Sequence, residues 1–212
     1  MKDCCEIRAD VPERQRRVLR VVLGINAAMF VAELGGGLLA ASTALVADSV
    51  DMLGDAIVYA ASLHVVGRGP RWLARSALLK GAVMAAFAAG VLVEVAVKLA
   101  RGAVPAADLM TGVGLAALAA NVFCLALLSR RRDDDINMRS AWICSRNDVV
   151  ANSGVLLAAA AVAWTGSAWP DIAVGLAIAA MFCAGAVRVV RAAWRELHPR
   201  PVGVALPRPR SR

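Results

Sequence analysis

The chain has 212 residues, of which 59% are hydrophobic, and it carries a formal net charge of +8 at pH 7. A soluble domain is typically about half apolar, so a mean hydropathy of +0.63 places most of this chain in a lipid bilayer. The positive charge does not indicate nucleic-acid binding, because the Lys and Arg residues lie between apolar segments and at the ends rather than among stacking aromatic residues.

Six apolar segments, each near the roughly 20 residues that a helix needs to cross a bilayer, predict an all-α polytopic membrane protein. In chain order the predicted spans cover approximately 18–39, 42–66, 77–99, 109–128, 138–164 and 170–190. Helix-breaking residues mark the connections between the spans. They are Ala41-Ser42, Gly69-Pro70, Pro105 and Thr165-Gly166-Ser167.

The distribution of Arg residues predicts the orientation of the spans. Arg is concentrated before the first span, in the second–third and fourth–fifth connections and after the sixth span. The first–second and fifth–sixth connections have no Lys or Arg, and only Lys98 and Arg101 stand on the opposite side. The positive-inside rule therefore places both termini in the cytoplasm, for a protein of the cytoplasmic (inner) membrane. We expect a cytoplasmic tail at 1–17, one membrane domain at 18–195 and a flexible basic tail at 196–212.

Three carboxylates interrupt the second span. Asp48, Asp51 and Asp55 fall at i, i+3 and i+7, within one face of a helix. A carboxylate at membrane depth costs roughly 2.5–3.5 kcal/mol on insertion scales, so it marks a functional site by default. Because like charges repel strongly at low dielectric, some of the three must be protonated or a cation must lie among them.

The fifth span carries a second polar face, where Cys144, Asp148 and Asn152 follow one another at intervals of four residues. Carboxylate oxygen and thiolate sulfur are ordinary zinc ligands, and the two pairs Asp51/Asp55 and Cys144/Asp148 provide the four that a tetrahedral ion requires. The spacing therefore predicts a divalent-metal site between the second and fifth helices. Protons compete with metal for such ligands, which is the physical basis of a metal–proton antiporter.

Other polar residues in the spans are candidates for a cation or proton pathway. Glu33 and Asn26 in the first span either line such a path or pair within the bundle. Asp48 is expected to handle protons or support the ligands, and Asn152 shares the face of Asp148. Asp171, near the far end of the sixth span, is either structural or lines the exit.

Three further patterns give local predictions. Glu94 and Lys98, four residues apart in the third span, predict an ion pair near the outer interface. The run Gly35-Gly36-Gly37 indicates close helix packing, because no strand precedes it as a phosphate-binding loop requires. Cys4 and Cys5 in the N-terminal tail are candidates for capturing soft metals.

Three segments resemble the cation diffusion facilitator family. ELGGGLLAASTALVADSVDMLGDA is similar to the family's first and second helices, with Asp51 and Asp55 at the paired ligand positions. INMRSAWICSRNDVVANSGVLLAA is similar to its fifth helix, with Cys144 where His is usual and Asp148 at the carboxylate. TGSAWPDIAVGLAIAA resembles its entry to the sixth helix, with Asp171 after the Pro. The resemblance extends over about 17–195.

The resemblance implies a secondary transporter, not an enzyme, that exports divalent transition metals of the Zn, Cd and Co class from the cytoplasm in exchange for protons. Its ligands would be Asp51, Asp55, Cys144 and Asp148, with the metal as transported substrate, no separate cofactor and a homodimeric assembly. A thiol in place of imidazole favours softer ions such as Cd²⁺. We also expect the cytoplasmic C-terminal domain that is common in the family to be absent.

Three alternatives remain open at this stage. The chain would be a non-transporting metal sensor or partner subunit if metal binds without flux. The two polar pairs would instead be neutral groups that hold helices together by hydrogen bonds. An intramembrane hydrolase with Cys144 as nucleophile needs a base, and neither His64 nor His198 lies near membrane depth.

Overall fold

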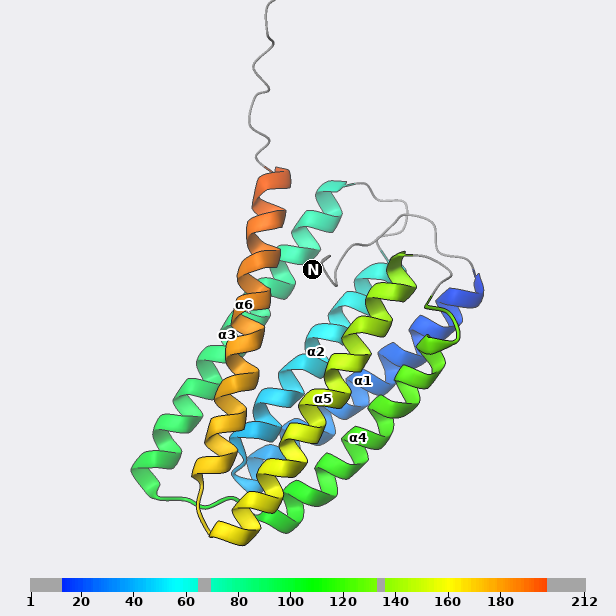
Figure 1. Cartoon of the computed structure of the whole chain (residues 1–212). Helices are drawn as coiled ribbons and strands as arrows, with labels where there is room; N and C mark the ends of the chain where they lie inside the picture. Colours follow the sequence, from blue (N-terminus) through cyan, green and yellow to red (C-terminus); the bar gives the residue numbers. More distant parts are fainter. Residues whose placement is uncertain (1–12, 65–69, 133–135, 198–212) are drawn as a thin grey trace, which may run out of the picture.

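The computed structural model describes residues 13–64, 70–132 and 136–197, which form six α-helices and, within these ranges, no strand (Figure 1). The all-α prediction is thereby confirmed. In chain order the helices are α1 (Glu13–Ala40), α2 (Thr43–His64), α3 (Pro70–Arg101), α4 (Ala107–Ser129), α5 (Ile136–Thr165) and α6 (Trp169–Leu197).

The connections at one end of the bundle are short and well defined. Ala41, with a φ of 51°, follows α1 in the left-handed region, and the amide of Ser42 donates to the Gly37 carbonyl oxygen at 2.8 Å. This bond and that from the Ala41 amide to the Leu38 carbonyl oxygen form the Schellman motif that ends many helices. Gly102 and Gly166 end α3 and α5 with φ values of 63° and 62°. We refer to this end as the turn end.

The opposite end of the bundle carries most of the Arg residues, and we refer to it as the basic end. The start of α1, the end of α4, the start of α5 and the end of α6 all lie there (Figure 1). Three helices extend clearly further at this end than the apolar pattern predicted, since α1 begins at Glu13, α3 begins at Pro70 and α6 ends at Leu197. Pro70 is the first residue of α3, where its missing N–H costs nothing.

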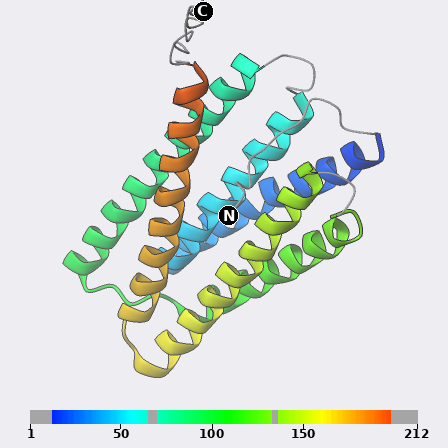
Figure 2. The same cartoon turned by 45° about the horizontal axis from the view of Figure 1, so that its top comes forward.

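The helices pack mainly as three pairs: α1 with α2, α4 with α5, and α3 with α6. The α3–α6 pair lies to one side of the other four helices, with α2 as the main neighbour that it shares with them (Figure 2). Gly36 and Gly37 allow α1 to approach its neighbours closely. A Cβ on Gly36 would lie 2.6 Å from Val113 Cγ2 of α4, and a Cβ on Gly37 would lie 2.9 Å from the Val46 backbone nitrogen of α2. The prediction of close packing is confirmed for these two glycines.

Large apolar side chains face outward along the helices, as expected for contact with lipid. They include Val31, Leu38, Leu39, Leu92, Val93, Leu115, Phe123, Leu157 and Trp164. By length and composition, four segments of the described chain are able to cross a membrane: Glu13–Ala40, Gly81–Arg101, Ala107–Ser129 and Ala141–Thr165. Of the other two helices, α2 contains three Asp residues, and α6 has a shorter apolar stretch at Trp169–Gly185. The fold is that of a multi-pass integral membrane protein.

The bundle has two apolar clusters, one toward each end. A turn-end core gathers small and branched residues of α2, α3, α5 and α6, among them Leu45, Val46, Val91, Val155 and Ile178. A basic-end core consists of Leu19, Val22, Tyr59, Cys124, Leu128, Met138 and Ala141. Along α2 and α5, the polar positions 51, 55, 144 and 148 lie between these two cores.

Candidate metal centre

The α2 side of the predicted site consists of two buried carboxyl groups. Asp51 and Asp55 lie one turn apart near the middle of α2, with 9% and 4% of their surface exposed. Asp is a poor residue for a helix interior, because its short polar side chain competes for backbone hydrogen bonds. Packing of α2 against α1, α3, α5 and α6, rather than helix propensity, therefore holds these carboxyl groups in the bundle.

The α5 side has one turn of helix with a thiol and a carboxyl group. Cys144 is half-buried, whereas Asp148 is 3% exposed. Arg146 is exposed and lies over the Trp142 ring, 5.4 Å from its centroid, so its guanidinium group does not occupy the site.

Asp148 connects the two helices. Its carboxyl group hydrogen-bonds that of Asp51 and also interacts electrostatically with Asp55. Cys144 lies in the same neighbourhood, because Tyr59 interacts electrostatically with Asp55, Cys144 and Asp148. Two ionised carboxylates have only acceptor atoms, so a hydrogen bond between Asp51 and Asp148 requires a shared proton.

The predicted ligands are neighbours but do not form a closed cage. Within the described ranges there is no group of three or more His, Cys, Asp or Glu side chains placed to hold one ion. Mutual repulsion of carboxylates opposes such a cluster unless protons or a cation compensate it. Contacts between α2 and α5 are sparser than those of α2 with its other neighbours. Assignment of all four residues to one ion therefore stays a prediction.

Tyr59 is a member of this site that the sequence analysis missed. Its hydroxyl donates to Asp55 Oδ2 at 2.9 Å, and its side chain is buried. The available signal was its position four residues after Asp55, on the same helix face. Tyrosine in an apolar run resembles ordinary core packing, so the spacing alone did not identify it.

Glu33 of α1 and Asp48 of α2 are fully buried and lie close enough to interact electrostatically. Neither carboxyl group has a hydrogen-bond partner. A buried ionised carboxylate without a partner is too costly to persist, so groups in this position are expected to carry a proton or to meet a mobile cation. That Glu33 and Asp48 belong to a cation or proton pathway stays a prediction.

Asn26 and Asn152 are also fully buried, but the side-chain amide of each donates to a backbone carbonyl oxygen of its own helix. Asn26 Nδ2 donates to the Val22 carbonyl oxygen at 2.9 Å, and Asn152 Nδ2 donates to the Asp148 carbonyl oxygen at 3.0 Å. The Oδ1 atom of each has no hydrogen-bond partner. These two acceptors remain available for a proton donor or a cation.

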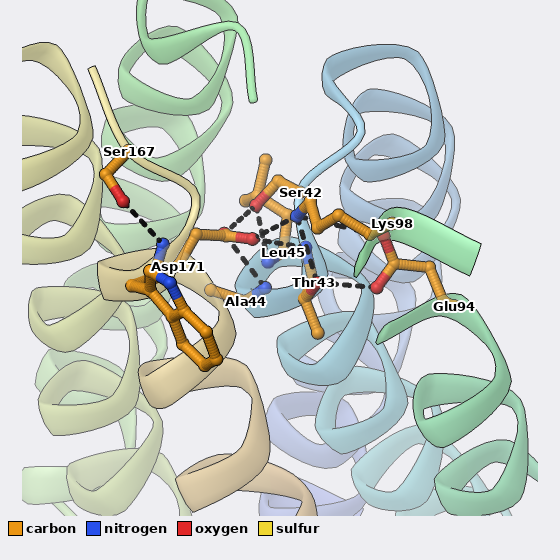
Figure 3. Close-up of polar contacts among 9 residues, drawn as sticks. Ser42, Thr43, Ala44, Leu45, Glu94, Lys98, Ser167 and Asp171 are labelled. Carbon is orange, nitrogen blue, oxygen red and sulfur yellow. Dashed lines mark hydrogen bonds and ion pairs between the residues drawn. The ribbon is translucent and has the colours of Figure 1, made fainter. Parts of the chain in front are cut away.

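Asp171 lies at the turn end, in a separate network at the start of α2 (Figure 3). Its carboxylate accepts hydrogen bonds from Ser42 Oγ at 2.6 Å and from the amides of Thr43 and Ala44 at 2.7 and 3.1 Å. Since Ser42 Oγ also accepts from the Leu45 amide, Ser42 and Asp171 together satisfy the free N–H groups of the first turn. Of the two roles expected for Asp171, the structural one accounts for all of these contacts.

Lys98 completes the network. Its Nζ lies 2.5 Å from Asp171 Oδ2, 3.0 Å from Thr43 Oγ1 and 3.8 Å from Glu94 Oε1. The predicted Glu94–Lys98 ion pair is confirmed, but the shorter bond to Asp171 was not foreseen. One ammonium group thus connects α3, α6 and the start of α2.

Cys4 and Cys5 lie outside the described residues.

Comparison with known proteins places these features in a family. A profile of the cation efflux transmembrane domain matches residues 19–198. The metal cation efflux system protein CzcD of Cupriavidus metallidurans is 26% identical over 181 residues, which are 80% of this chain and 57% of the relative. The zinc transporter ZitB of Escherichia coli is 26% identical over 198 residues, 87% of this chain and 61% of its own length.

ZitB of Yersinia pestis is 28% identical over 192 residues, which are 84% of this chain and 59% of that protein. The chain therefore spans between 57% and 61% of the length of these curated relatives. The region that the profile matches includes α1 from residue 19 onward, the whole of α2 to α6 and both polar pairs of the candidate site. The chain belongs to the cation efflux family, that is, to the cation diffusion facilitators.

Proposed function

We propose that this protein exports divalent transition-metal cations of the Zn, Cd and Co class from the cytoplasm, across the cytoplasmic membrane, in exchange for protons. The observation that carries the proposal is the hydrogen bond between the buried Asp51 and Asp148 carboxyl groups, with Asp55 beside them. The names of the relatives, a metal cation efflux system protein and a zinc transporter, support the same substrate class.

Asp51, Asp55, Cys144 and Asp148 are the proposed ligands. Three carboxylates and one thiolate match the oxygen and sulfur donors that Zn²⁺ and Cd²⁺ accept in tetrahedral sites. A divalent ion between α2 and α5 would relieve the repulsion among the carboxylates. It would thereby draw together two helices that have few direct contacts.

Exchange for protons follows from the ligand chemistry. A metal ion that binds Asp51 and Asp148 must displace the proton that the two carboxyl groups share, because coordination requires ionised ligands. A proton that returns to the pair weakens the hold on the ion. Alternating access of the site to the two ends of the bundle would convert this competition into antiport.

Glu33 and Asp48 are proposed to carry protons between this site and the turn end. Both are buried with unpaired oxygens, and Glu33 interacts electrostatically with Asp48 and Asp51. Asn26 and Asn152 would line the same path with their free Oδ1 atoms. We also propose a homodimer, which the mass of the protein in lipid nanodiscs would verify.

The test is metal uptake by proteoliposomes under an imposed proton gradient, with Zn²⁺, Cd²⁺, Co²⁺, Fe²⁺ and Mn²⁺ compared. We expect uptake that collapses with the gradient and that Asp148→Asn abolishes, because the amide cannot act as an anionic ligand. Asp108→Asn, which removes an exposed carboxylate at the start of α4, is the matched control and should transport normally. Normal transport by Asp148→Asn would refute the ligand assignment, and saturable binding without uptake would refute transport.

A further inference from the structure

Tyr59 is the only tyrosine in the chain, and it lies between the candidate metal site and the basic end. It follows Asp55 by one turn of α2, and its hydroxyl donates to Asp55 Oδ2 at 2.9 Å. The side chain is 2% exposed, so this hydrogen bond is shielded from water. A buried hydroxyl that loses its partner costs roughly 1–3 kcal/mol, which favours keeping the bond formed.

The ring of Tyr59 is fixed independently of its hydroxyl. It belongs to the basic-end core, where side chains of three other helices surround it: Leu19 and Val22 of α1, Cys124 and Leu128 of α4, and Met138 and Ala141 of α5. An aromatic ring held from several sides has little rotational freedom. The position of the hydroxyl oxygen is therefore set by packing, and Asp55 is oriented by that oxygen.

Tyr59 also lies near the α5 side of the site. Tyr59 interacts electrostatically with Cys144 and Asp148 as well as with Asp55. The hydrogen bond to Oδ2 restrains rotation of the Asp55 carboxyl group. In metal sites, ligating carboxylates are typically held in this way by a hydrogen bond from a neighbouring residue.

We propose that Tyr59 is a positioning residue of the metal site, which fixes the orientation of the Asp55 carboxyl group by holding Oδ2. This inference rests on the proposed function, because it requires that Asp55 binds the transported metal. Tyr59 itself does not touch the ion. It acts by lowering the conformational freedom that Asp55 would otherwise lose on coordination.

Tyr59→Phe tests the inference, since Phe keeps the ring and its packing but removes the donor. The full chain in lipid nanodiscs would be titrated with Cd²⁺ and with Zn²⁺, and the ultraviolet absorbance of the Cd–thiolate bond would report coordination by Cys144. We expect the dissociation constant for both ions to rise by about 10–100-fold, the usual effect of removing a group that orients a metal ligand. A purely structural role for Tyr59 would lower the unfolding temperature and leave the dissociation constant unchanged.

A double-mutant cycle separates action through Asp55 from a general effect. If Tyr59 acts only through this carboxylate, Tyr59→Phe adds no further loss of affinity in the Asp55→Asn background. Ser153→Ala is the matched control, because it also removes a hydroxyl from a helix of the site but one that bonds only the Val149 carbonyl oxygen. We expect its metal affinity to equal that of the unmodified protein.

The outcomes distinguish this inference from the proposed function. Unchanged or tighter binding by Tyr59→Phe, beside weak binding by Asp148→Asn, would overturn the role of Tyr59 and leave the metal site intact. Additive losses in the cycle would likewise overturn it. If the unmodified chain binds neither ion, the proposed function fails and the inference fails with it.

Discussion

At the scale of single residues, the candidate site combines two kinds of donor atom, oxygen and sulfur. The described residues place one thiol and three carboxyl groups around the α2–α5 interface, with Asp51 and Asp148 in a hydrogen bond. Sulfur is a softer donor than imidazole nitrogen or carboxylate oxygen. Of the four proposed ligands, Cys144 is therefore the one that we expect to influence the preference among divalent ions most.

Replacement of Cys144 by His should shift that preference. Cys144→His is expected to keep metal transport but to lower the ratio of Cd²⁺ to Zn²⁺ uptake by about tenfold, in line with the softness of sulfur relative to nitrogen. The measurement is uptake of both ions by proteoliposomes. Cys183→Ala, a change at an exposed cysteine of α6, is the control and should leave the ratio unchanged. An identical metal profile for Cys144→His would count against ligation by Cys144.

At the scale of secondary-structure elements, contacts with neighbouring helices fix the position of α2. Its first turn is capped by Ser42 and by Asp171 of α6, and the backbone of α6 lies directly against it. A Cβ on Gly175 would lie 2.8 Å from the Thr43 carbonyl carbon and 2.9 Å from its oxygen. Contact at this point is between main chains, so no side-chain rotation can make room.

Gly175→Ala should therefore displace α6 from the start of α2. We expect a loss of about 1–3 kcal/mol of stability, the usual cost of forcing an extra carbon into a packed contact. Thermal unfolding in detergent would measure it. Gly185→Ala, on the same helix with nothing within 4 Å of the added carbon, should be neutral or stabilising. Equal stability of the two variants would show that α6 does not pack as described.

The sequence predicted these elements better than their contacts. Hydropathy located all six helices, because a helix that crosses the bilayer needs about 20 predominantly apolar residues, and such segments stand out in the sequence. Spacing also placed Asp51 with Asp55 and Glu94 with Lys98, since each pair is one turn apart. The bond between Lys98 and Asp171 joins residues 73 positions apart, and periodicity carries no information about such pairs. Helix bounds at the basic end were missed because amphipathic turns outside the lipid have no apolar signature.

At the scale of the whole molecule, the two ends of the bundle are held differently. The turn end is joined by the Lys98–Asp171 pair and by the Ala106 amide, which donates to the Ala40 carbonyl oxygen at 2.9 Å. At the basic end, the interior is an apolar cluster around Tyr59. The turn end is therefore held by directional polar contacts, and the basic end by apolar packing.

Loss of the ammonium group should weaken the turn end. Lys98→Met leaves Asp171 as a buried charge without its counter-ion, and breaking such a pair typically costs about 3–5 kcal/mol. We expect a lower unfolding temperature in detergent, with much of the loss recovered in Lys98→Met/Asp171→Asn. Lys98 is 3% exposed, so an exposed control such as Arg101→Met at the end of the same helix should have little effect. Full stability of Lys98→Met alone would contradict this account of the turn end.

The tight connection between α1 and α2 has a consequence for biosynthesis. With three Asp residues, α2 is too polar to partition into the bilayer by itself, whereas α1 meets the requirement for independent insertion. Ala41 and Ser42 alone separate the two helices, and Glu33 of α1 lies near Asp48 of α2 on their inner faces. We therefore expect α1 and α2 to enter the bilayer together as a helical hairpin, with their polar groups facing each other.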